Sequence, residues 1–91
     1  MKKYLIERSL PGIDSMSADE LKAAAQHSNN VLEELGPDIQ WVESYVIHDQ
    51  TLCIYLARDE DILREHAEKT GFGLVKITEV KSMIDPGTAE A

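Results

Sequence analysis

IQWVESYVIHDQTLCIYLA, residues 39–57, is the stretch of the chain that decides the fold. Both halves are rich in Val, Ile, Tyr and Trp, which favour extended backbone, and His48-Asp49-Gln50 separates them. Two such runs joined by a tight reversal are typical of a β-hairpin. The sequence therefore predicts two paired strands, over residues 39–48 and 51–57.

A helix is expected on each side of this hairpin. SADE, residues 17–20, has the form of a capping box, and the helix that begins there should end at GP, residues 36–37. After the hairpin, DED, residues 59–61, places carboxylates beside the positive end of a second helix dipole. That helix should end at Gly71.

Short β-type runs near both ends complete the pattern. One covers residues 3–8 and stops before Pro11-Gly12, and the other covers about residues 74–84. The order β-α-β-β-α-β is that of the ferredoxin-like α+β fold, or alpha-beta plait, in which two helices cover one face of a four-stranded antiparallel sheet. We expect residues 1–85 to form this single domain and residues 86–91 to form a flexible C-terminal tail.

Composition excludes several classes of partner. The chain has 91 residues, 43% of them hydrophobic and 29% charged, as in ordinary globular domains. Its net charge of −8 would repel nucleic acid and anionic membrane surfaces. No signal peptide is recognisable, no apolar run approaches the roughly 20 residues of a membrane span, and Cys53 is the only cysteine. We therefore expect a cytoplasmic protein without nucleic-acid or membrane partners.

Side-chain alternation along the strands predicts two different sheet faces. The aliphatic set expected under the helices is Val42, Val46, Leu52, Ile54 and Leu56, with Tyr4 and Ile6. The set expected on the open face is Trp41, Glu43, Tyr45, Ile47, Cys53 and Tyr55, with Leu5 and Glu7. Such a face is too apolar for water, so we expect a homodimer paired sheet to sheet, with Trp41, Tyr45 and Tyr55 lining a pocket between the sheets. Alternatively, these aromatic side chains only pack across strands.

A metal site is the sharpest chemical hypothesis. His66, Glu43, Cys53 and Glu7 together offer imidazole, carboxylate and thiolate, which suit nickel, zinc or copper. No CxxC, HxxxH or HExxH motif is present, so separate strands or two chains would have to assemble the site. His66 shares a helix face with apolar residues, so it reaches the glutamates only at an edge or end of the sheet. Otherwise it is a structural histidine whose ring nitrogens have local partners. Independently of His66, a cation such as Arg8 or Lys3 is an alternative partner for the glutamates.

Catalysis has weaker support from the sequence. Acidic and phenolic neighbours disfavour a thiolate nucleophile at Cys53, and GFG, residues 71–73, follows a helix instead of opening one as phosphate loops do. General acid–base chemistry by Glu43 and His66 stays an alternative. The second hypothesis is thus a small-molecule-binding protein or an enzyme that uses the cavity between paired sheets.

Four stretches resemble a family of small bacterial proteins of unknown function: ERSLPG (residues 7–12), LGPDIQWVESYV (35–46), the strand with Cys53 and Tyr55, and REHAEKTGFG (64–73). The resemblance extends from residue 4 to about residue 85. One described member of this family is a nickel-binding, dimeric, ferredoxin-like protein. The resemblance therefore implies the same fold, a homodimer and a nickel or other divalent metal. It places Glu7, Trp41, Tyr45, Cys53 and His66 at positions typical of the family.

Two departures from the family pattern bear on the metal. Gly73 stands where the family often has proline, and Glu43 stands where the nickel-binding member has histidine. A carboxylate suits harder ions than an imidazole does. The combined expectation is a small cytoplasmic homodimer that binds a divalent transition metal such as nickel.

Overall fold

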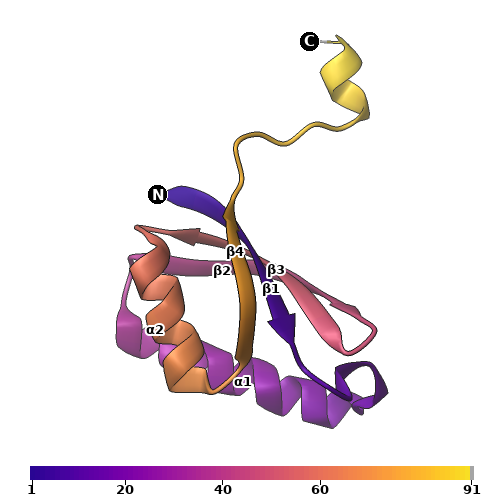
Figure 1. The fold of residues 1–91 in the computed structure, drawn as a ribbon, viewed down its shortest axis with the longest axis vertical. Coiled ribbons are helices and arrows are strands. Elements are labelled where there is room, and N and C mark those ends of the chain that lie inside the picture. Colours follow the sequence, from indigo (N-terminus) through magenta and orange to yellow (C-terminus); the bar gives the residue numbers. More distant parts are fainter. Residues whose placement is uncertain (91) are drawn as a thin grey trace.

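Six main elements follow one another in the predicted order. The computed structural model describes residues 1–90. Its helices and strands are β1 (Lys2–Ser9), α1 (Ala18–Leu35), β2 (Ile39–Ile47), β3 (Gln50–Ala57), α2 (Glu60–Thr70) and β4 (Gly73–Glu79) (Figure 1). Two short 3-10 helices, η1 (Ile13–Ser15) and η2 (Pro86–Glu90), lie before α1 and near the C-terminus. The strands form one antiparallel sheet in the order β2-β3-β1-β4, which confirms the ferredoxin-like prediction.

Local signals in the sequence fix the ends of the helices. The Ser17 hydroxyl accepts a hydrogen bond from the Glu20 N–H at 3.2 Å, and the Glu20 carboxylate accepts one from the Ser17 N–H at 3.1 Å, so the capping box is complete. Gly71 ends α2 with a left-handed backbone, φ 76°, which favours glycine. In residues 1–90, no helix has both the length and the apolar character of a membrane span.

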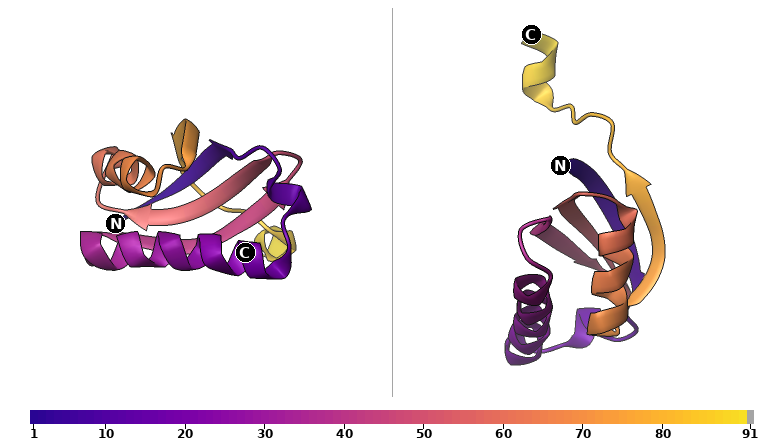
Figure 2. Two further views of the ribbon diagram at one scale, coloured as in Figure 1. Left: turned by 90° about the horizontal axis from the view of Figure 1, so that it is seen from below. Right: turned by 90° about the vertical axis from the view of Figure 1, so that its left-hand side faces the viewer.

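The last strand is shorter than predicted. β4 ends at Glu79, opposite Tyr4, and one further hydrogen bond of 2.8 Å joins the Val80 N–H to the Lys3 carbonyl. β1 begins at Lys2, so residues beyond Val80 have no neighbouring strand to pair with. The chain therefore leaves the sheet there and leads away to η2 (Figure 2, right).

The pairing of β1 with β3 decides which side chains enter the core. Tyr4 lies opposite Tyr55, and Ile6 lies opposite Cys53, so all four side chains point toward the helices. The buried apolar cluster consists of Tyr4, Ile6, Ile39, Cys53, Tyr55, Ala57, Ile62 and Leu63. The predicted burial of Tyr4 and Ile6 under the helices is thus confirmed.

The predicted faces of the hairpin are wrong for β3 and for Trp41, whereas Glu43, Tyr45 and Ile47 lie on the open face as predicted. Cys53 and Tyr55 are only 4% and 2% exposed under the helices, and Trp41, opposite Tyr55, lies on the same side. The aliphatic set expected in the core is half-buried on the open face instead: Leu52, Ile54 and Leu56. Both faces of the sheet are apolar, so hydrophobicity cannot choose between them. Pairing with β1 makes the choice, and a slip of one residue exchanges the faces.

The two valines of β2 are not core residues either. A β-bulge between Trp41 and Glu43 takes Val42 out of the regular alternation, and its side chain is 44% exposed. Val46 lies on the helix side, opposite Thr51, but near the end of an edge strand, and it is 45% exposed. The prediction that Val42 lies under the helices is therefore wrong, whereas Val46 lies on the predicted side without being buried.

Candidate functional site

The structure does not bring the four predicted metal ligands together. His66 and Cys53 are buried on the helix side of the sheet. Glu7 pairs with Leu52 and Glu43 with Ile54, so both carboxylates lie on the open face. Within residues 1–90, no group of three or more His, Cys, Asp and Glu side chains is placed to hold a metal ion. One copy of the chain therefore does not assemble the predicted set.

His66 has a hydrogen-bond partner at each ring nitrogen. Its Nδ1 lies 3.3 Å from Nη2 of Arg8, and its Nε2 lies 3.1 Å from the Oγ of Ser28. A guanidinium can only donate, so Nδ1 accepts and the ring proton resides on Nε2, which donates to Ser28. His66 thus joins α1, α2 and β1, as a structural histidine does.

The surroundings of His66 keep its ring neutral. The pKa of His66 is lowered from 6.5 to about 4, first because burial disfavours the charged ring and second because Arg8 is positively charged; the backbone of Ser28, as a hydrogen-bond acceptor, acts in the opposite direction. The same guanidinium would repel a metal cation approaching Nδ1. A neutral ring could still ligate a metal, but in residues 1–90 Arg8 and Ser28 already occupy both ring nitrogens of His66.

Arg8 is buried without an acidic partner. Its side chain is 2% exposed, and its Cζ lies 6.0 Å from the centre of the Tyr55 ring, within cation–π range. None of the ion pairs among the described residues includes Arg8. Its Nη1 also has no hydrogen-bond partner there. Buried charges are normally paired, so packing alone does not account for this guanidinium.

Sequence reasoning considered Arg8 only as a partner for the glutamates of the open face. Arg8 lies on the other side of the sheet from Glu7, as adjacent strand residues do, and cannot serve there. The sequence did contain a signal for the burial of Arg8. Side chains alternate along a strand, so Arg8 points to the same side as Tyr4 and Ile6, under the helices.

A cavity of about 370 Å³ lies between α1 and the helix side of the sheet, and Arg8 lines it. Ser28, Cys53 and Tyr55 also line the cavity. Most of the remaining wall is apolar and includes Leu10, Ile13, Leu21, Ala25, Trp41 and Val46. Trp41 and Tyr55 therefore line a cavity, but on the opposite side of the sheet from the predicted one.

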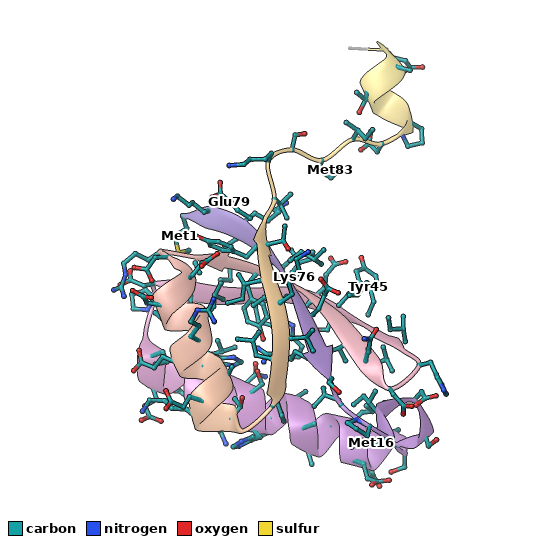
Figure 3. The ribbon with its side chains drawn as sticks, in the orientation of Figure 1. Met1, Met16, Tyr45, Lys76, Glu79 and Met83 are labelled. Atoms are coloured by element: carbon teal, nitrogen blue, oxygen red, sulfur yellow. The ribbon has the colours of Figure 1, made fainter. Side chains whose placement is uncertain are left out.

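The open face carries the remaining predicted residues. Glu7, Glu43 and Tyr45 lie there with an apolar set that consists of Leu5, Ile47, Leu52, Ile54 and Leu56. The Tyr45 hydroxyl donates a hydrogen bond to the Glu43 carboxylate. Tyr45 is 54% exposed and extends from the side of the hairpin away from α1 (Figure 3). A second hollow, next to Glu43 and Tyr45, is bordered by Lys3, Val80 and Met83.

Comparisons with known proteins agree with this fold. The family model described as nickel responsive protein SCO4226-like matches residues 4–80. Among solved structures, the crystal structure of SCO4226 from Streptomyces coelicolor A3(2) has a TM-score of 0.73 at 15% identity, over 90% of this chain and 99% of that chain. At that identity the likeness concerns the fold alone. No curated protein matches the chain.

Proposed function

Because this chain belongs to the family of SCO4226-like nickel responsive proteins, we propose that it is a homodimeric binding protein for a divalent transition metal such as nickel. The observation that carries the proposal is the open face, where carboxylates stand among apolar side chains with no helix over them. We place this function in the cytoplasm, where a lone thiol such as Cys53 stays reduced.

The dimer is supported by the amount of apolar surface on the open face. Tyr45 and Ile47 are 54% and 40% exposed, and Leu52, Ile54 and Leu56 beside them are only half-buried. A contiguous apolar patch of this kind is typical of an interaction surface. A second copy packed sheet to sheet would remove it from water.

The metal is supported by the burial of carboxylates in a twofold interface, where their charge needs compensation. Each copy contributes Glu7 and Glu43, so symmetry brings the same carboxylates from both copies into one interface. A carboxylate withdrawn from water needs a cation, hydrogen-bond donors or a proton. Tyr45 supplies one donor to Glu43, and Lys76 lies opposite Glu7 in the β1–β4 pair, but no ion pair among the described residues includes either glutamate. A divalent ion would compensate the negative charge that remains in the interface. Oxygen ligands discriminate weakly among such ions, so we expect only a modest preference for nickel over zinc.

The test combines sedimentation velocity with equilibrium dialysis against nickel, using protein without a histidine tag. We expect a dimer at micromolar concentration and saturable nickel uptake that Glu43→Gln or Glu7→Gln removes. Glu33→Gln, at an exposed position of α1, is the matched control and should leave uptake unchanged. A stable monomer, or uptake that survives both open-face substitutions, would contradict the proposal.

The two predicted ligands in the core need a separate measurement. His66→Gln and Cys53→Ser should leave nickel uptake unchanged, because both side chains lie on the other side of the sheet from the glutamates. Loss of nickel uptake in either folded variant would indicate that the metal site lies in the core and not on the open face.

A second candidate function is small-molecule binding. The observation that favours it is the cavity beside Arg8, which requires neither a second sheet nor a metal.

A further inference from the structure

We propose that the cavity between α1 and the sheet binds a small amphipathic monocarboxylate, with its carboxylate on the guanidinium of Arg8 and its apolar body along α1 and Trp41. This site lies on the opposite side of the sheet from the proposed metal site. Success or failure of one proposal therefore leaves the other standing.

Arg8 supplies the recognition of the anion. Arg8 is 2% exposed and is one of the residues that line the cavity; its Nη2 is engaged with His66, and its buried Nη1 has no hydrogen-bond partner in residues 1–90. A carboxylate is the common partner of a buried guanidinium, and hydrogen bonds between charged groups are the strong ones. Since no acid of the described chain fills this role, a ligand that carries the negative charge completes the site.

The cavity lining carries a single positive charge, which favours a ligand with one negative charge. Among the described residues that line the cavity, Arg8 is the only charged one. The polar lining residues nearest the core, Ser28, Thr51 and Tyr55, are neutral groups that can share a hydrogen bond with a carboxylate. A phosphate dianion would leave part of its charge uncompensated, and a cation would face a guanidinium.

The rest of the wall selects an apolar body. Leu21, Ala24 and Ala25 of α1 stand across the cavity from Trp41 and Val46 of β2. A volume of about 370 Å³ falls within the roughly 300–1,000 Å³ of small-molecule sites. The small side chains of Ala24 and Ala25 leave this space open, and an unbranched alkyl chain or a single aromatic ring would occupy it.

Trp41 provides the readout, because it is the only tryptophan of the chain and it lines the cavity. We would titrate metal-free protein with decanoate and with 4-phenylbutanoate, which distinguish an aliphatic body from an aromatic one. Decanol has the tail without the charge, and acetate has the charge without the tail. A saturable change of Trp41 fluorescence is expected with at least one of the two long carboxylates, at least tenfold weaker binding with decanol, and no change with acetate.

Two substitutions separate the head group from the body. Arg8→Leu should weaken carboxylate binding about tenfold to a hundredfold, the usual range for a hydrogen bond to a charged group, and leave decanol binding unchanged. Ala25→Phe should fill the cavity and abolish binding of both compounds. Ala23→Phe, at an exposed position of the same helix, is its matched control and should bind like the wild type.

Three results would overturn the proposal: no saturable signal with either long carboxylate, equal affinity for decanoate and decanol, or unchanged carboxylate affinity in a folded Arg8→Leu variant. Circular dichroism checks the fold of each variant. If Arg8→Leu does not fold, the comparison of Ala25→Phe with Ala23→Phe tests the proposal. Loss of binding only in Ala25→Phe supports the site, and any other pattern refutes it.

Discussion

A mildly acidic pH should destabilise this protein through His66. The pKa of His66 is about 4 in the folded chain, because of burial and then the charge of Arg8, and near 6.5 when the chain is unfolded. Between these values the unfolded state binds a proton that the folded state does not. The free energy of unfolding therefore decreases as the pH falls from above 6.5 toward 4. The stabilising contribution of the neutral His66 ring is complete only above pH 6.5.

The magnitude follows from the two pKa values. The difference between 6.5 and about 4, at 1.36 kcal/mol for each pKa unit, amounts to about 3 kcal/mol once the pH is below both values. Lowering the pH from 7 to 5 covers part of that range and should cost about 2 kcal/mol.

Other shifted groups act elsewhere on the pH scale. Asp14 has a pKa below its ordinary 3.8, chiefly through the hydrogen bond with His48, so its contribution is lost only at lower pH. The same hydrogen bond raises the pKa of His48 above 6.5, so its contribution is present at low pH and lost as the pH rises. Neither group produces a loss of stability between pH 7 and pH 5.

The assay is denaturant unfolding at pH 7 and pH 5, at one protein concentration because a dimer's apparent stability depends on it. His66→Gln keeps an acceptor and a donor but does not titrate. It should lose about 2 kcal/mol less than the wild type over this range, whereas His48→Gln should not reduce the loss. An equal loss in the wild type and His66→Gln, or an NMR titration of His66 near pH 6.5, would refute the reasoning.

Three further predictions concern single sites. Cys53, only 4% exposed, should react with Ellman's reagent only as the chain unfolds; rapid labelling of the native protein would contradict its placement. Ser17→Ala removes one bond of the capping box and should reduce the free energy of unfolding by about 1 kcal/mol in denaturant titrations; no change would mean that the cap is not formed. Tyr45→Ser should weaken dimerisation at least tenfold in sedimentation equilibrium, and an unchanged dissociation constant would place the interface elsewhere.

The sequence by itself determined the order of the elements and the ends of the helices, because those signals are local, whereas it placed the end of the last strand too far along the chain. SADE at residues 17–20 and Gly71 act on the backbone within a few residues of themselves, and both do so as predicted. The alternation in β1 was also readable, since Tyr4 and Ile6 are buried as expected. The resemblance to a known family rested on the same kind of local pattern.

Only the tertiary structure decided which side of the sheet the residues of β3 and Trp41 occupy and what surrounds His66. The side chains of β2 and β3 are apolar on both faces, so their orientation depends on the register with β1, which no local pattern encodes. Arg8 and His66 meet although they are 58 positions apart in the chain. Their contact requires the sheet and both helices to be assembled, and for this reason the buried guanidinium and its cavity emerged only from the folded chain.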